Sequence, residues 1–265
     1  MTVATMNISG RVNEQVESQE GSSLRRVAKM TGLLYLVLFV AGMFSPMVLE
    51  TLVVSDSAIE TAENLLSAKT WFGFSLVTWF VIVVIDVAVS ITLYVLFENS
   101  GRTISMISAG FRLVYSAVLA AFLLELYEAY TVLNTSGGLA GADLTLAYET
   151  VAAGVTKFQA GFQLALMFFG SHLVVLGVSI VRSGRLPRIL GVILGVSGVG
   201  YVVDSMVIFL TSTHNANLTI ALLMPAVIGE LGLTLYLLVK GVRTGEKDLS
   251  SADASPIQTE SVSAA

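Results

Sequence analysis

The sequence predicts an all-α membrane protein in which six spanning helices form a bundle and both termini lie in the cytoplasm. Three observations predict this fold class. Only 12% of the 265 residues are charged, 55% are hydrophobic, and the mean hydropathy is +0.82. A soluble domain is about a quarter charged, so this chain has too few charged side chains to cover a globule of its size. The other two observations are six long apolar stretches and a sorted distribution of basic residues.

Six stretches reach the roughly 20 residues that a spanning helix needs. A strand through a bilayer needs only about 10 residues and alternates in polarity, whereas these stretches do not alternate. The first stretch also exceeds the roughly 7–15 residues of a signal-peptide core, so we expect it to be retained. The spans cover about residues 30–49, 71–97, 104–126 (with room for an extension to Leu133), 158–181, 189–210 and 218–239.

Basic residues collect on the cytoplasmic side of membrane proteins, and here they alternate with the loops. If the N-terminus is inside, only Lys69 and Lys157 fall outside, and Arg112 lies within a span. We therefore expect a multi-pass protein of the plasma (cytoplasmic) membrane. The inner segments carry all the other basic residues, which are Arg11, Arg25, Arg26, Lys29, Arg102, Arg182, Arg185, Arg188, Lys240, Arg243 and Lys247.

The two ends of the chain have a different composition. Residues 1–24 and 244–265 are rich in Ser, Glu, Gln and Thr and have few large apolar side chains, so we expect them to be disordered. The six-helix domain then occupies residues 25–243. Between the first two spans, residues 56–68 are expected to form a short surface helix, because their apolar side chains share one face.

Five ionisable side chains lie well inside the predicted spans, and each is a functional hypothesis because a charge in lipid is costly. Glu125 and Glu128 lie near the outer end of the third span, where we expect them to be solvated. At 1.5 Å per residue, one of the five, Asp204, lies roughly 22 Å from the cytoplasmic end of its helix, and the other four lie roughly 12–16 Å from theirs. Four groups on four helices thus reach one level, where we expect a polar layer. The five candidates are Asp86, Arg112, His172, Asp204 and Glu230.

The neighbours of these residues favour an internal layer. Ser105, Ser108 and Ser116 share one helical face with Arg112, at spacings of three and four residues. Pro225 lies in the sixth span and is expected to loosen that helix and to free a carbonyl group inside the bundle.

A structural interpretation of the same residues stays open. Arg112 can form a buried ion pair with Asp86 or Glu230 that fixes the register of the helices. His172 can hydrogen-bond a serine or a carbonyl group of another helix. Asp204, near the outer end of its span, can be solvated.

No cofactor is expected. The chain has no cysteine, which excludes disulfides and thiolate ligands. A weak alternative metal set is His172, Asp204 and Glu230, but catalytic zinc usually takes three ligands with more imidazole.

The expected partners are the lipid bilayer and an unknown small molecule, and not nucleic acid, because the sequence contains no nucleotide or nucleic-acid motif. Gly191 and Gly195 form a pair of small residues four apart, which is typical of close helix packing. We expect any homo-oligomer to use this glycine-rich face.

Several strings in the spans and inner loops carry a family resemblance. The strings are Gly32-Leu33-Leu34-Tyr35-Leu36, Asp86-Val87-Ala88, Phe111-Arg112-Leu113, Gly170-Ser171-His172-Leu173, residues 183–191, Asp204-Ser205 and Gly229-Glu230-Leu231. With them, the chain from about residue 25 to 243 resembles the bacterial membrane family catalogued as domain of unknown function 4386. The resemblance implies a prokaryotic six-helix membrane protein, and it supplies no activity and no catalytic roles.

Three functions remain open from the sequence. The first is a small-solute or proton-linked carrier, in which Glu230 and His172 exchange protons and Arg112 holds an anionic group or a counter-ion. The second is an intramembrane hydrolase that acts on lipid, with His172, Asp204 and Glu230 activating water. The third is a non-catalytic scaffold or accessory subunit, in which the buried charges serve assembly alone.

Overall fold

The protein is all-α over the part of the chain described by the structure, a computed structural model covering residues 2–211 and 216–243. Six of its helices are long and apolar enough to cross a membrane, which confirms the predicted all-α bundle with six spans and a multi-pass protein in contact with lipid. The elements are α1 (Thr2–Leu52), α2 (Ala58–Ser67), α3 (Lys69–Phe97), the 3₁₀ turn η1 (Glu98–Ser100), α4 (Arg102–Thr135), α5 (Gly141–Ser183), α6 (Arg188–Thr211) and α7 (Ala216–Val239).

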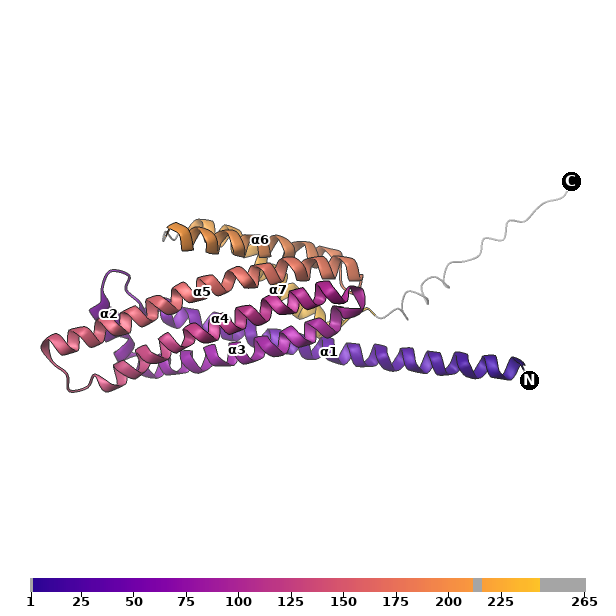
Figure 1. Cartoon of the computed structure of the whole chain (residues 1–265), viewed down its shortest axis with the longest axis horizontal. Coiled ribbons are helices and arrows are strands. Elements are labelled where there is room, and N and C mark those ends of the chain that lie inside the picture. Colours follow the sequence, from indigo (N-terminus) through magenta and orange to yellow (C-terminus); the bar gives the residue numbers. More distant parts are fainter. Residues whose placement is uncertain (1, 212–215, 244–265) are drawn as a thin grey trace.

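The six long helices form a closed ring in chain order. Each packs against the next one in the sequence, from α1 through α3, α4, α5 and α6 to α7, and α7 packs back against α1 (Figure 1). The short helix α2 lies outside the ring and packs mainly on α5. Side chains from all six long helices can therefore meet on the axis of the bundle.

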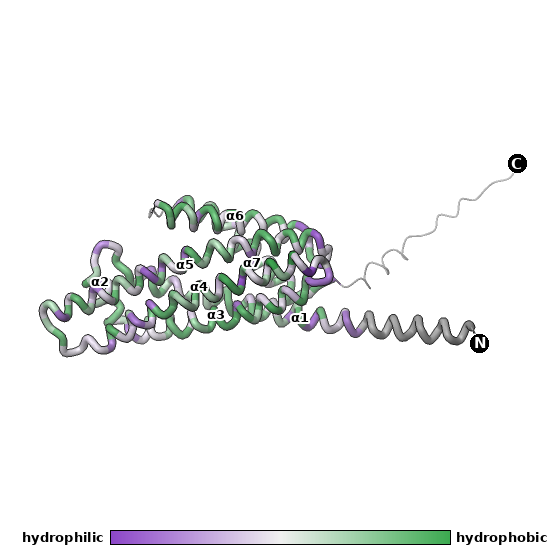
Figure 2. The backbone as a smooth tube through the Cα atoms, in the orientation of Figure 1, coloured by the Kyte–Doolittle hydropathy of each residue, from purple (hydrophilic) through white to green (hydrophobic). Residues whose placement is uncertain are grey.

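Both described ends of the chain lie at the same end of the bundle. Gly32 of α1 packs against Leu238 of α7, and Gly241 lies beside Ala28. The backbone N–H of Arg243 donates a 3.0 Å hydrogen bond to the carbonyl of Arg185 in the α5–α6 turn. Figure 2 shows hydrophilic residues gathered at this end and apolar residues along the middle of the helices.

Helix α1 differs from the sequence expectation at its start. Residues 1–24 were expected to be disordered, whereas the structure has helix from Thr2. Residues 2–24 contain no proline and only two glycines, Gly10 and Gly21, so little in this segment stops a helix that propagates back from the span. The predicted C-terminal tail, 244–265, lies outside the described residues.

Helix α5 is much longer than the predicted span 158–181. Its 43 residues correspond to about 64 Å, twice the roughly 30 Å hydrocarbon core. The added turns bury Val151 and Val155, and α5 packs against α4 and α2. Helix α2 in turn buries Leu65. It lies within residues 56–68, where the sequence predicted a short surface helix. The predicted span stops short of this extension because the extension is amphipathic. Its mean hydropathy combines an apolar face with a polar face and is therefore too low to indicate a span.

A seam of glycines joins α5 to α6. Gly177 faces Gly191, and Gly170, seven residues earlier on α5, faces Gly198, seven residues later on α6. A Cβ atom on Gly191 would lie 2.7 Å from the carbonyl oxygen of Gly177, and one on Gly170 would lie 2.6 Å from that of Gly198. The backbones are therefore in direct contact, as small residues allow within a membrane. The predicted role of Gly191 in a homo-oligomer is at odds with this packing, because α5 of the same chain covers it.

We expect Gly191→Ala to lower the melting temperature in detergent, because the two helices must separate to accommodate the new Cβ atom. Gly195→Ala is the matched control one turn away, where an added Cβ atom meets nothing within 4 Å. Alanine there should stabilise the helix by up to about 1 kcal/mol through its higher helix propensity. Equal changes in melting temperature for the two variants would contradict the seam.

Candidate functional site

The candidate site is built around Arg112, in the middle of α4. Its side chain is 1% exposed and is among the largest fully buried side chains of the described chain. Ser105, Ser108 and Ser116, on the same face of α4, are also buried. The polar stripe that the sequence predicted thus faces the interior of the ring.

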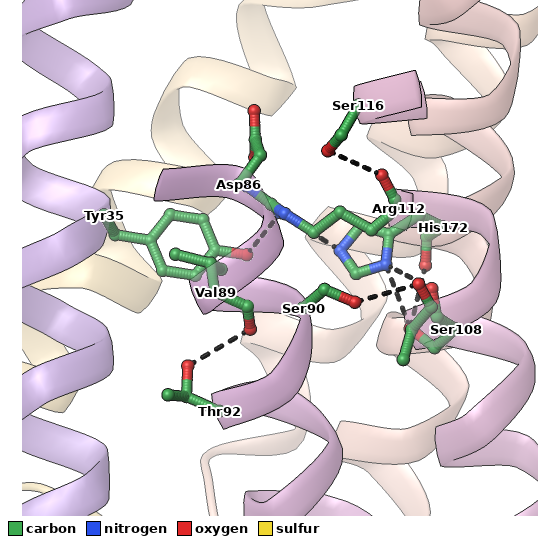
Figure 3. A network of polar contacts seen from close by, with 10 residues as sticks. Tyr35, Asp86, Val89, Ser90, Thr92, Ser108, Arg112, Ser116 and His172 are labelled. Atoms are coloured by element: carbon green, nitrogen blue, oxygen red, sulfur yellow. Dashed lines mark hydrogen bonds and ion pairs between the residues drawn. The ribbon is translucent and has the colours of Figure 1, made fainter. Parts of the chain in front are cut away.

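The guanidinium group of Arg112 joins four helices. Its Nη2 atom forms an ion pair with Asp86 of α3. Its Nη1 atom donates a 2.9 Å hydrogen bond to the hydroxyl of Tyr35 on α1 and lies 3.2 Å from Nε2 of His172 on α5 (Figure 3). The rings of Tyr35 and Phe169 lie 5.0 and 5.3 Å from its central carbon, at cation–π distance. One side chain therefore cross-links α1, α3, α4 and α5.

The contacts of His172 fix its tautomer. Its Nδ1 atom lies 2.9 Å from the backbone carbonyl of Ser108, which only accepts hydrogen bonds, so Nδ1 carries the hydrogen. Its Nε2 atom faces the guanidinium of Arg112, which only donates, so Nε2 is the acceptor. His172 is fully buried and neutral in this arrangement, and both ring nitrogens are occupied.

A cavity of about 240 Å³ lies beside the guanidinium, inside the ring. Asp86, Arg112 and Glu230 line it, and three of its other lining residues are exposed at the bundle surface, Gly42 and Met43 on α1 and Val227 on α7. Its other walls are mainly aromatic, from Tyr35, Phe39, Trp79, Tyr115, Phe162, Phe169 and Tyr201.

Glu230 of α7 lines the same cavity but takes no part in the ion pair between Arg112 and Asp86. Its carboxyl group interacts with the hydroxyl of Tyr201 on α6 and lies within the electrostatic influence of Arg112 and Asp86. Glu230 takes part in neither the Arg112–Asp86 nor the Lys157–Glu125 ion pair, and it has no basic partner among the side chains that the structure describes. The structure thus brings four predicted residues, Asp86, Arg112, His172 and Glu230, around one centre.

Asp204 lies elsewhere. It is 4% exposed and accepts a 2.7 Å hydrogen bond from the hydroxyl of Thr219, which links α6 to α7 outside the cavity lining. No group of three His, Cys, Asp or Glu side chains in the described part of the chain is placed to hold a metal ion. The weak metal set His172, Asp204 and Glu230 is therefore not brought together.

Sequence reasoning missed the aromatic lining. Tyr35 and Tyr115 carry no charge and lie in apolar helices, so hydropathy gave no reason to single them out. A signal existed for Tyr115, because it lies three residues after Arg112 on the buried face of α4. The same signal existed for Phe169 and Tyr201, which lie three residues before His172 and Asp204.

A larger apolar hollow, of about 860 Å³, lies between the first half of α3 and the second half of α4. Its lining includes one charged side chain, Lys69, and exposed residues such as Phe74 and Val77, which face lipid. It contains no carboxyl or imidazole group. The smaller central cavity is therefore the candidate for chemistry.

Comparison with known proteins gives a family and no activity. The family model described as a domain of unknown function, DUF4386, matches residues 30–241. The chain belongs to this family. A relative from Archaeoglobus fulgidus, named as an uncharacterized protein, is 26% identical over 173 residues, which cover 65% of this chain and 87% of the relative. No solved structure matches the chain.

We expect Arg112→Gln to destabilise the protein by about 3–5 kcal/mol, because it leaves the carboxylate of Asp86 buried without its counter-charge. Lys157→Gln is the control, since it breaks the Lys157–Glu125 pair, whose side chains are 61% and 32% exposed. Such an exposed pair contributes about 0–1 kcal/mol. Thermal unfolding in detergent compares the two, and equal stability would show that the buried network does not brace the bundle.

Proposed function

We propose that this DUF4386 protein is a proton-linked carrier of a small solute, and that the central cavity is its binding site. The observation that carries the proposal is Glu230, a carboxyl group that lines a cavity inside the spanning region and has no basic partner among the described residues. Ionised carboxylates inside a membrane cost roughly 2.5–3.5 kcal/mol or more and usually mark ion or proton pathways.

The polar layer divides into two parts under this proposal. Arg112, Asp86 and His172 form a brace, because the two charges form an ion pair and both terminal nitrogens of Arg112 are engaged. Glu230 is the exchanging group, because a proton is the simplest way to neutralise its charge. Of the two roles that the sequence left open for Arg112, to hold an anionic group or a counter-ion, we propose the second, with Asp86 as the counter-ion.

Two helices carry internal prolines, and both border the cavity. Pro46 interrupts α1 and Pro225 interrupts α7. A proline removes the hydrogen bond to the carbonyl four residues earlier and favours a bend. In α1 that carbonyl belongs to Gly42, which lines the cavity together with Pro46. We propose that α1 and α7 are the elements that bend when the cavity changes access.

The contacts of His172 favour a carrier over a hydrolase. The hydroxyl of Ser108 lies 3.1 Å from Nδ1 of His172, but that nitrogen already donates to a carbonyl and so cannot accept the serine proton. The other ring nitrogen faces Arg112. A general base must be free to take a proton, and His172 does not line the cavity.

The orientation follows from the basic residues. We propose that the end at which α1 and α7 meet faces the cytoplasm, because the turns at that end carry Arg102, Arg182, Arg185 and Arg188. The protein would then lie in the plasma membrane with its cavity opening through the outer half of α1.

The test is solute-dependent proton movement in proteoliposomes that contain a pH-sensitive dye. Among amines, amino acids, sugars and organic acids, we expect at least one solute to drive proton movement in the wild type. Glu230→Gln should abolish this movement while the melting temperature stays close to that of the wild type. Asp204→Asn is the control, because it changes a buried carboxyl outside the cavity and keeps an oxygen that can accept from Thr219. The absence of proton movement with every solute would contradict the proposal.

A further inference from the structure

We infer that the cavity binds a small organic ammonium ion, and that the carboxylate of Glu230 is its counter-ion. This inference rests on the proposed function, since it names the class of solute. Three features of the described cavity carry it, namely its charge, the commitment of its arginine and its aromatic walls.

The charge of the cavity favours a cation. The ionisable groups that face Glu230 are Tyr35 of α1, Asp86 of α3, Arg112 and Tyr115 of α4, and Tyr201 of α6. No lysine or histidine is part of the lining, and Asp86 neutralises Arg112 as an ion pair. One guanidinium against two carboxylates leaves a net charge of −1 when Glu230 is ionised. A single positive charge on the solute would balance it.

Arg112 is unavailable to an anionic solute. Both of its terminal nitrogens are engaged, one by Asp86 and the other by Tyr35 and His172. Two of its five N–H groups remain, namely Nε–H, which is buried and has no partner, and the second N–H of Nη2, which lies beside Asp86. An anion held by these two groups would lie next to the carboxylate of Asp86, which already neutralises Arg112, and the two like charges would repel each other.

The walls suit an alkylated ammonium group. Seven aromatic side chains line the cavity, and several are packed ring against ring, with centroid distances of 5.1 Å for Tyr115–Phe169 and Trp79–Phe162 and 5.3 Å for Phe169–Tyr201. Aromatic faces around a carboxylate are the usual way in which proteins bind quaternary ammonium ions. The volume of about 240 Å³ equals about eight water molecules in the liquid, so the ligand is small.

The solute and a proton then exchange at Glu230. Without solute the carboxyl group keeps its proton and is neutral. When the ammonium ion enters, the O–H bond breaks, its electron pair stays on the carboxylate, and the proton leaves to water. One positive charge replaces another, so the charge inside the membrane stays the same in both states. The energetic penalty of an unpaired charge in lipid is thereby avoided throughout.

The experiment measures binding and proton release by the purified, full-length protein in weakly buffered detergent. The probes are choline and tetraethylammonium as cations, dimethylbutanol as the uncharged carbon isostere of choline, and dimethylbutanoate as an anion. We expect at least one cation to bind at least ten-fold more tightly than the isostere and the anion, with release of up to one proton for each bound ion. Glu230→Gln should lose the proton release and at least ten-fold in affinity, whereas Asp204→Asn should keep both.

The inference is overturned if neither cation binds, if the isostere binds as well as choline, or if binding survives Glu230→Gln unchanged. Because the assay needs no membrane, its result is separate from that of the flux assay. Cation binding with proton release but without flux would contradict the proposed carrier function and would support the ammonium site. Proton-linked flux of another solute without cation binding would contradict only the assignment of the solute as an ammonium ion.

Discussion

The ion pair between Arg112 and Asp86 is the interaction on which the rest of the structure depends. An arginine at the centre of a membrane bundle is tolerated only when its charge and its donors are satisfied. Here Asp86 supplies the charge, and Tyr35 and His172 accept from the other terminal nitrogen. Because each partner comes from a different helix, satisfying one side chain sets the relative positions of α1, α3, α4 and α5.

The other two helices are held differently. Neither α6 nor α7 contributes a hydrogen bond to Arg112 among the described contacts, and α7 packs mainly on its ring neighbours α6 and α1. The glycine seam attaches α6 to α5 by backbone contact, and Asp204 attaches α7 to α6 through Thr219. The ring thus combines a braced set of four helices with a pair that carries Glu230 and Tyr201. The carboxyl group that exchanges protons thus lies on the less constrained side of the bundle. Movement of these two helices could open the cavity to one side of the membrane and close it to the other.

Much of this arrangement could be predicted from the sequence, because lipid imposes simple rules. Length and hydropathy define the spans, and the 1.5 Å rise per residue placed Asp86, Arg112, His172 and Glu230 at one level and Asp204 away from it. The choice between Asp86 and Glu230 as the partner of Arg112 could not be predicted, because both lie at the same depth and only the order of helices around the ring separates them. The extension of α5 was missed because it is amphipathic. The α5–α6 contact of Gly191 could not be assigned, because a small-residue pair looks the same within a chain and between chains.

The central claim is that Glu230 alternates between a protonated and an ionised form while the brace around Arg112 stays charged. Infrared difference spectroscopy of the protein in lipid at neutral pH tests it most directly, because a protonated carboxyl has a carbonyl band distinct from that of a carboxylate. The account predicts such a band in the unliganded wild type and in Asp204→Asn, its loss on addition of choline or tetraethylammonium, and its absence in Glu230→Gln. A band that persists in Glu230→Gln, or a wild type without any protonated carboxyl, would contradict it.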